Sequence, residues 1–219
     1  MISLKEGFIF IHVPKTAGTS IKKYLAGYDL RKKWTPDPNE ILYLYSHMTA
    51  CQLRSALKKH DSSIREGCFF QFAFVRNPWE RALSAFRYLA RGGSGTQWDV
   101  KIASLLKIFN LSFMSFVKYG LLHLGEKIPH FYPQYYWTHK DLGNMPLDYI
   151  GRYENLTNDL ENIMAIIRPE QVMGTTPLPW LRKSDHDHYS CYYDDETKDL
   201  VARFYREDIR LLGYEFEKA

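Results

Sequence analysis

The segment from Pro14 to Ser20 brings a lysine, a glycine and three hydroxyl side chains together in seven residues, Pro-Lys-Thr-Ala-Gly-Thr-Ser. Hydroxyl groups, backbone N–H groups at a helix start and a nearby ammonium group all bind anionic oxygens, so this grouping predicts a phosphate site. Lys15 precedes Gly18, whereas ordinary nucleotide hydrolases carry the order G-x-x-x-x-G-K-[ST], in which the last residue holds magnesium. The segment therefore predicts a phosphate site of another kind.

The residues around this segment predict the elements that position it. Residues 7 to 13 are almost all apolar and predict a buried parallel strand, which Pro14 ends because its nitrogen has no hydrogen to donate. Ile21, Tyr24 and Leu25 follow at helical spacing and predict a helix over residues 19 to 26. The unpaired N–H groups of its first turn are expected to face the loop.

A second strand followed by a sharp turn and a helix begins at residue 69. Residues 69 to 75 predict a buried strand, and residues 78 to 90 predict a helix. Asn77 is typical of an N-cap, Pro78 of a first helical residue, and Glu80 of a capping-box partner. A rigid turn is therefore expected at the tip of this strand.

Three polar residues of this second unit can bind a second phosphate. Arg76 follows the strand tip, and Arg81 and Ser84 lie three residues apart on one helix face. A guanidinium and a hydroxyl group placed in this way can converge on one anion. The alternative is that Arg76 or Arg81 pairs with a nearby carboxylate. Taken with the first segment, the residues favour two anion sites and hence a ligand with two phosphates.

Strands and helices alternate along the chain, which predicts an α/β fold with a P-loop-like central parallel sheet flanked by helices on both faces. A single domain is expected over residues 1–219, with a helical cap inserted at 92–145 after the glycines that follow residue 91. The remaining expected elements are strands at 41 to 45 and 148 to 152, a helix at 49 to 59, one or two helices within 97 to 124, a helix with an apolar face from Leu156 to Ile167 that Arg168-Pro169 ends, a loop at 174 to 193, and a last helix from Asp194 or Asp195.

Composition limits the partners. The chain has 219 residues and a net charge of +4, with 29 basic and 25 acidic residues and no block of like charge, which favours a small anion or a sugar over nucleic acid. Three widely spaced cysteines fit neither a disulfide framework nor a zinc site and indicate a reducing compartment. No signal peptide or spanning segment is recognised, so no membrane partner is expected.

The two phosphate segments together carry a family resemblance. Pro14 to Ser20 and Arg76 to Phe86 resemble the 5′- and 3′-phosphate-binding motifs of sulfotransferases. Further matches lie along most of the chain, and they resemble the carbohydrate sulfotransferase branch that includes heparan sulfate 2-O-sulfotransferase: Ser46-His47, His130 to Gln134, Asp148 to Leu156, and Leu212 to Tyr214. The resemblance implies 3′-phosphoadenosine 5′-phosphosulfate (PAPS) as donor cosubstrate, held by Lys15, Thr16, Ala17, Gly18, Thr19, Ser20, Arg76, Ser84 and Lys183, with no metal required.

The resemblance also implies in-line transfer of a sulfuryl group to an acceptor hydroxyl, with Lys15 stabilising the leaving phosphate. His47 matches the catalytic histidine of that branch and is the expected base, because an imidazole titrates near neutrality. The alternative for His47 is a histidine that caps a strand or bonds a carbonyl. His12 lies inside the apolar strand and is expected to pack beside the loop, and Glu154 is the reserve base.

The acceptor is expected to be a carbohydrate, with His130, Gln134 and Glu154 as candidate binding residues. His130 lies among aromatic residues that suit either sugar stacking or core packing. Arg182 and Ser184, beside Lys183, are further candidates for the nucleotide. The basic triplet 31 to 33 and the acidic and histidine run 185 to 188 are expected to be solvated loops.

Two rival functions stay open from the sequence. A small-molecule or nucleotide kinase would need magnesium ligands and a lysine after the second glycine, and neither is present at the expected place. A binding module that keeps the nucleotide site without turnover is the other alternative. A bacterial cytoplasmic enzyme is the expected context, with a trimmed Golgi luminal domain as the alternative. The sequence indicates neither the acceptor's identity nor an oligomeric state.

Overall fold

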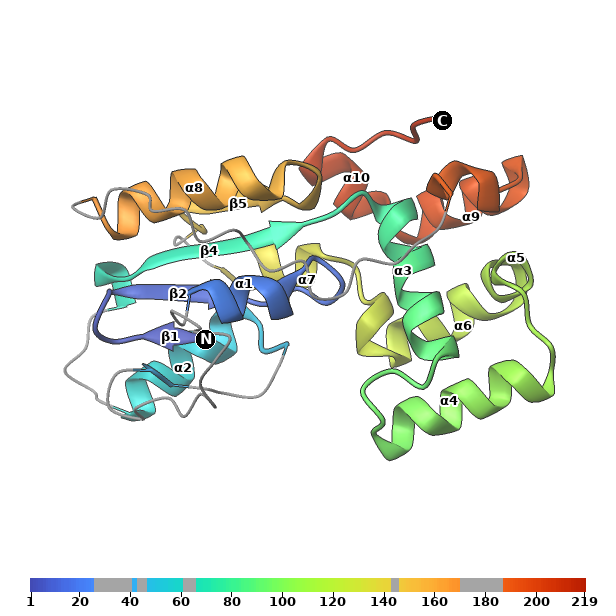
Figure 1. The fold of residues 1–219 in the computed structure, drawn as a ribbon, viewed down its shortest axis with the longest axis horizontal. Coiled ribbons are helices and arrows are strands. Elements are labelled where there is room, and N and C mark those ends of the chain that lie inside the picture. Colours follow the sequence, from blue (N-terminus) through green and yellow to red (C-terminus); the bar gives the residue numbers. More distant parts are fainter. Residues whose placement is uncertain (26–40, 43–46, 61–65, 143–145, 170–186) are drawn as a thin grey trace. The chain divides into compact units, whose positions relative to one another are not determined.

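The computed structural model describes residues 1–25, 41–42, 47–60, 66–142, 146–169 and 187–219. The chain divides into two compact units (Figure 1). Unit 1 comprises Met1–Val75 and Gln134–Lys183, and unit 2 comprises Arg76–Pro133 and Ser184–Ala219. The single domain over 1–219 with a cap at 92–145 stays a prediction.

Unit 1 is built on a five-stranded sheet in the order β3-β1-β2-β4-β5. The strands are β1 (Ile2–Ser3), β2 (Phe8–Ile11), β3 (Ile41–Leu42), β4 (Phe70–Val75) and β5 (Tyr149–Arg152). β2, β4 and β5 pair in parallel, while β1 is antiparallel to both β2 and β3. Consequently β3, β2, β4 and β5 run in one direction, and their carboxyl ends meet at one edge of the sheet.

The expectation of a wholly parallel sheet is wrong for β1, which the sequence pattern did not reveal. Two residues are too few to show a period, and Ile2 pairs with Ile9 across a short connection. Gly7 in that connection has a φ of 64°, a left-handed conformation that glycine adopts without strain. A connection this short permits only an antiparallel pair, because parallel strands need a long crossover.

The faces of the sheet follow the alternation of side chains along the strands. Phe8, Phe10, Phe72 and Phe74 share one core with helices α1 (Gly18–Leu25) and α8 (Leu156–Ile167). On the other face Gln71 of β4 accepts a hydrogen bond from Arg54 of α2 (Ala50–His60), Nε to Oε1, at 2.8 Å. In Figure 1, α8 and α2 lie on opposite sides of the sheet. Helices on both faces are therefore confirmed.

The predicted bounds hold closely for the elements nearest the two phosphate segments. α1 begins one residue earlier than expected, and α3 (Pro78–Ala90) has the expected bounds. Of the strand expected at 41 to 45, only Ile41–Leu42 lies within the described residues. The loop expected at 174 to 193 is described only from residue 187, and Tyr189–Tyr192 forms a 3-10 helix there.

Unit 2 packs around α3. Its other elements are α4 (Gln97–Ile108), α5 (Phe113–Phe116), a π-helical turn (Val117–Leu121), α6 (Leu122–Leu124), α9 (Asp195–Phe204), α10 (Arg206–Leu212), and 3-10 helices at Gly125–Lys127, Pro129–Phe131 and Tyr189–Tyr192. The last helix expected from the sequence is thus two helices. In unit 1, 3-10 helices lie at Glu66–Cys68 and Tyr153–Asn155, and α7 is Tyr135–Thr138.

Arg81 is a fully buried polar residue of unit 2 that bonds protein groups. This contradicts the prediction that Arg81 binds a phosphate. Its side chain is fully buried, and Nη2 donates to the carbonyl oxygens of His130 at 3.3 Å and Tyr132 at 2.7 Å. The guanidinium lies 5.7 Å from the ring centroid of Tyr205, and the buried Asp208 carboxylate is near enough to favour its charge. Arg81 therefore joins α3 to α10 and to the segment before residue 133.

Replacing Arg81 with leucine is expected to lower the free energy of unfolding by about 3 kcal/mol, because two carbonyls and the Asp208 charge would remain buried without the guanidinium. Urea unfolding followed by far-UV circular dichroism measures this loss. The matched control is Arg203→Leu, which removes an exposed arginine of α9 and should change stability by less than about 0.5 kcal/mol. Equal losses for the two variants would contradict the role given to Arg81.

Candidate functional site

The turn between β2 and α1 has an unusual backbone. Lys15 and Ala17 have φ values of 71° and 63°, in the left-handed region that residues with a side chain rarely adopt. Thr16 between them has no positive φ, so the conformations alternate in the manner of backbone nests that bind anions. The Thr16 hydroxyl donates to the Val13 carbonyl at 2.9 Å and closes the turn. Backbone strain of this kind is typical of functional sites.

Gly18, at the start of α1, allows a close approach of the His12 ring. A Cβ atom built on Gly18 would lie 1.9 Å from Cδ2 and 2.0 Å from Nε2 of His12. No side chain larger than hydrogen fits there without moving the imidazole. The same ring also stacks against Phe10, with centroids 6.0 Å apart. Gly18 therefore provides the space in which the strand end and the helix start pack together.

His12 is a neutral imidazole in this environment. Burial is the main cause that lowers its pKa well below 6.5, and the nearby charges of Lys22, His47, the amino terminus and Lys15 act in the same direction. Its Nδ1 atom is buried and has no hydrogen-bond partner among the described residues. Burial also lowers the pKa of Lys22. The surroundings of His12 are thus rich in positive charge, which suits an anionic ligand.

His47 lies against His12, with ring centroids 4.5 Å apart. Its Nδ1 is 3.2 Å from the His12 carbonyl oxygen. A carbonyl oxygen only accepts, so Nδ1 carries a hydrogen, and in the neutral form of the ring Nε2 has the lone pair of a base. The indole of Trp137 donates to the His47 carbonyl at 2.9 Å, and His47 itself has a φ of 73°. The carbonyl bond is the alternative that the sequence left open for His47, and the strand end expected just before His47 lies outside the described residues.

Residues after β5 contribute to the same edge of the sheet, because β5 is parallel to β4. Glu154 is exposed in the short 3-10 helix that follows β5. The buried Asp159 fixes this connection by accepting from the Arg152 amide at 2.6 Å and from Asn155 Nδ2 at 3.0 Å. Glu154 is accordingly placed where the carboxyl ends of the strands meet, as is His47.

The second phosphate segment lies in unit 2. Asn77 caps α3, with its side-chain oxygen 3.1 Å from the Trp79 amide and 3.5 Å from the Glu80 amide, so the predicted cap is confirmed. The Glu80 carboxylate is 2.6 Å from Nη2 of Arg76, the carboxylate pairing that the sequence left open. Arg76 is 5% exposed, and Ser84 is half-buried on α3.

The remaining candidates are divided between the units. In unit 1, Gln134 is fully buried before α7, and its carbonyl accepts from the Thr138 hydroxyl at 3.1 Å. In unit 2, His130 packs on Tyr88, with ring centroids 4.9 Å apart. Lys183, with its neighbours Arg182 and Ser184, lies outside the described residues, as do residues 31 to 33 and 185 to 186.

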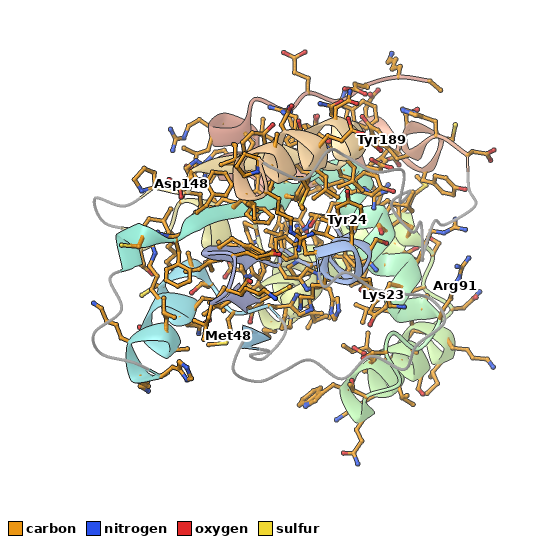
Figure 2. The ribbon with its side chains drawn as sticks, turned by 60° about the vertical axis from the view of Figure 1, so that its left-hand side comes forward. Lys23, Tyr24, Met48, Arg91, Asp148 and Tyr189 are labelled. Carbon is orange, nitrogen blue, oxygen red and sulfur yellow. The ribbon has the colours of Figure 1, made fainter. Side chains whose placement is uncertain are left out.

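Two contacts of this site follow only from the three-dimensional arrangement. Trp137 belongs to a run of aromatic residues in the sequence, and its indole N–H donates to the His47 carbonyl. The close packing of Gly18 on His12 depends on the strand end and the helix start meeting, which only a three-dimensional arrangement shows. Figure 2 shows the side chains and labels Tyr24 on α1 and Met48, the residue after His47.

Within the described ranges, no group of three or more His, Cys, Asp or Glu side chains is arranged to hold a metal ion.

Known proteins are similar in sequence to this chain. A family model with the description "Sulfotransferase family" matches residues 1–215 of the chain. A protein of Archaeoglobus fulgidus described as uncharacterized is 32% identical over 48% of this chain and 72% of its own length. Carbohydrate sulfotransferase 14 of Danio rerio is 24% identical over 98% of the chain, and that of Homo sapiens is 24% identical over 86%. The chain spans 61% and 52% of the lengths of these two relatives. No solved structure matches.

The buried His12 predicts a loss of stability in acid. The pKa of His12 lies well below 6.5 in the folded protein. Below about pH 6.5 this imidazole therefore takes up a proton in the unfolded chain but not in the folded one, and the free energy of unfolding decreases as the pH decreases. The slope from this one group is at most about 1.4 kcal/mol per pH unit. The amino terminus, whose pKa burial lowers to about 5, acts in the same direction between about pH 8 and 5.

Urea unfolding from pH 7 to 5 on His12→Phe and on the wild-type chain isolates the histidine, because the terminal amine is common to both. The wild type should lose more stability than the variant as the pH falls. His123→Phe, which changes an exposed histidine, should keep the wild-type pH dependence. Parallel pH dependences for His12→Phe and the wild type would refute a depressed pKa at His12.

Proposed function

The chain belongs to the sulfotransferase family, and from this premise we propose that it transfers a sulfuryl group from PAPS to a carbohydrate hydroxyl. The observation that carries the proposal is the left-handed turn at Lys15 and Ala17, which lies between the end of β2 and the first residue of α1. The printed names of two relatives supply the carbohydrate class of acceptor. PAPS supplies the activated sulfuryl group, and the protein must hold its phosphates and accept the developing charge.

The 5′-phosphate is assigned to the segment Lys15 to Ser20. Amide groups of the turn and of the first turn of α1 are the donors, because helix N-termini and alternating backbone conformations both bind phosphate oxygens. Thr16 would contribute through its amide, since its hydroxyl already bonds Val13. The fit is supported by Gly18, whose missing side chain keeps the helix start close to the strand end.

The 3′-phosphate is assigned to Arg76, Ser84 and Lys183 on the resemblance of their motifs. Arg76 is already paired with Glu80. A 3′-phosphate bound there would therefore share the guanidinium with the Glu80 carboxylate. An arginine suits this role, since its planar fork can bond two acceptors at once.

The reaction breaks the bond between the sulfur and the oxygen that it shares with the 5′-phosphate, and forms a bond from sulfur to the acceptor oxygen. The electron pair of the broken bond stays on the phosphate, where Lys15 stabilises the negative charge. The acceptor proton moves to Nε2 of His47, which has the lone pair because Nδ1 faces the His12 carbonyl. Glu154 is the reserve base, and His130, Gln134 and Glu154 remain the proposed acceptor-binding residues.

The test of this function is incubation with PAPS carrying a radioactive sulfur atom and a panel of glycans, with and without a chelator. Label transfer in both conditions supports the proposal and its expectation that no metal is needed. Nucleotide binding without transfer would favour a binding module. Phosphoryl transfer from a nucleoside triphosphate that the chelator abolishes would favour a kinase.

Lys15→Ala is expected to lower kcat by about 10²- to 10³-fold, because a charge that stabilises the leaving phosphate is lost. Steady-state sulfuryl transfer to the best glycan of the panel measures the change. Lys23→Ala removes a lysine of α1 eight residues away and serves as the matched control, with kcat within about twofold of wild type. If Lys15→Ala turned over like this control, Lys15 would be an ordinary lysine beside a turn.

His47→Gln is expected to lower kcat by about 10²- to 10⁴-fold and to remove the acid limb of the pH–rate profile, because the proton acceptor is lost. The readout is kcat against pH for wild type and variant. His123→Gln is the control, since this exposed histidine lies in unit 2. An active His47→Gln enzyme with an unshifted acid limb would exclude His47 as base and turn attention to Glu154.

A further inference from the structure

Helix α4 of unit 2 exposes large apolar side chains along much of its length. Trp98 and Ile108 are each 73% exposed, and Phe109, directly after the helix, is 67% exposed. Leu105 between them is 45% exposed. At 100° per residue, these four side chains and Lys101 lie on one side of the helix, which we call the α4 face. Single exposed apolar residues are ordinary, but a continuous stripe of this size marks an interaction surface.

The segment of the chain that contains α4 is mostly basic. From Arg87 to Gly125 the chain contains five Lys and Arg residues and one acidic residue, Asp99, a balance of 5 − 1 = +4. The rest of the chain therefore carries 24 basic and 24 acidic residues, so this stretch accounts for the entire net charge of +4. Lys118 is paired with Asp194 and Glu196, which leaves the basic residues nearer α4 to define the local charge.

The one acidic residue of this stretch is turned inward. Asp99 is 5% exposed, and its Oδ2 accepts from the Ser94 amide at 2.9 Å and from the Ser94 hydroxyl at 2.8 Å. These hydrogen bonds lower the pKa of Asp99 even though burial opposes the shift. Gly93, with a φ of 58°, leaves the space that the Asp99 side chain fills. The charged groups that α4 shows to solvent are thus Lys101 and Lys107.

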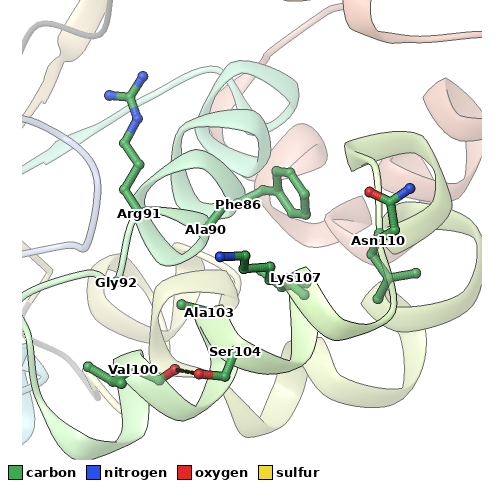
Figure 3. A pocket seen from close by; sticks show the side chains of 11 residues that line it. Phe86, Ala90, Arg91, Gly92, Val100, Ala103, Ser104, Lys107 and Asn110 are labelled. Atoms are coloured by element: carbon green, nitrogen blue, oxygen red, sulfur yellow. Dashed lines mark hydrogen bonds between the residues drawn. The ribbon is translucent and has the colours of Figure 1, made fainter.

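A pocket of about 520 Å³ between α3 and α4 lies on another side of α4 than the α4 face. Its described lining combines apolar side chains such as Phe86 and Ala103 with Arg91 and Lys107, and includes no acidic residue (Figure 3). On the α4 face, the Lys101 ammonium lies 5.6 Å from the Trp98 ring centroid. Apolar surface bordered by long basic side chains, with an indole among them, fits the boundary between lipid headgroups and acyl chains.

From this arrangement we propose that the α4 face docks on an anionic lipid bilayer, as a peripheral contact that spans nothing. Among the helices of the described residues, no single one is long and apolar enough to cross a membrane, although Gln97–Ile108 and the bent continuation Phe113–Lys127 reach that length and composition together. The sequence predicted no membrane partner because it lacks a spanning segment, and that reasoning does not address a surface helix. The proposal is independent of the sulfuryl transfer proposed above.

The test is co-sedimentation of the whole chain with vesicles of phosphatidylglycerol and phosphatidylcholine in equal amounts, and with vesicles of phosphatidylcholine alone. Binding to the anionic vesicles, weaker by at least tenfold on the neutral ones, is expected. The variant Trp98→Ser, Ile108→Ser, Phe109→Ser should bind at least tenfold more weakly. Lys101→Gln should lose about fivefold for its one charge. The matched controls, Ile166→Ser, which removes a 53% exposed apolar side chain of unit 1, and Lys58→Gln, should bind like wild type.

A second measurement does not depend on weakening the contact. Lipids brominated in their acyl chains should quench part of the tryptophan fluorescence of the wild type, and Trp98→Phe should remove the quenched part while still binding. Three results would overturn the proposal: no vesicle binding; equal binding by the apolar variant and its control; or a dimer of the free chain that the apolar variant converts to monomer without any vesicle binding. Binding to soluble dextran sulfate that the apolar variant retains, with no vesicle binding, would reassign the charges to a polyanionic sugar.

Discussion

The contact between the His12 ring and the α carbon of Gly18 is the constraint on which the candidate site depends. The ring fills the space that any side chain on Gly18 would need, and so fixes the distance from the end of β2 to the start of α1. Within that distance the chain reverses through Lys15 and Ala17 in left-handed conformations. The carbonyl of His12 in turn orients His47. One glycine thereby relates the helix start, the lysine and the imidazole to one another.

The electrostatics of unit 1 follow from the same packing. Lys15, Lys22 and the amino terminus all act on a buried imidazole, and they hold it neutral together with burial. Burial likewise disfavours the charged form of Lys22. A bound phosphate would offset this concentration of positive charge, which is a physical reason for an anion site independent of family membership. His12, neutral and packed, differs from His47, whose Nδ1 bonds the His12 carbonyl.

Much of the fold could be predicted because its signals are local. The apolar run before Pro14, the Asn77-Pro78 helix start and the spacing of Leu156, Leu160 and Ile163 each specify an element. β1 was not predicted, because two residues are too few to show a period. Its antiparallel pairing with β2 means that the sheet is not the wholly parallel one that the sequence had led us to expect. In the candidate site, Lys15 and His47 could be named from residue type and position. The roles of Trp137, of Gly18 and of the buried Arg81 depend on contacts between segments distant in sequence, and residue type alone does not specify these. The 3′-phosphate assignment stays a prediction.

The most direct measurement is the affinity of Gly18→Ala for adenosine 3′,5′-bisphosphate, the desulfated donor, by isothermal titration calorimetry. A methyl group at this position would meet the His12 ring at 1.9 Å and push the helix start away from the strand end, whereas Gly67, also in unit 1, has open space around it and makes Gly67→Ala the matched control. We expect wild type and Gly67→Ala to bind alike, and Gly18→Ala, still folded by circular dichroism, to bind at least about tenfold more weakly, about 1.4 kcal/mol. A folded Gly18→Ala protein with wild-type affinity would contradict the central claim that this close packing builds the phosphate site.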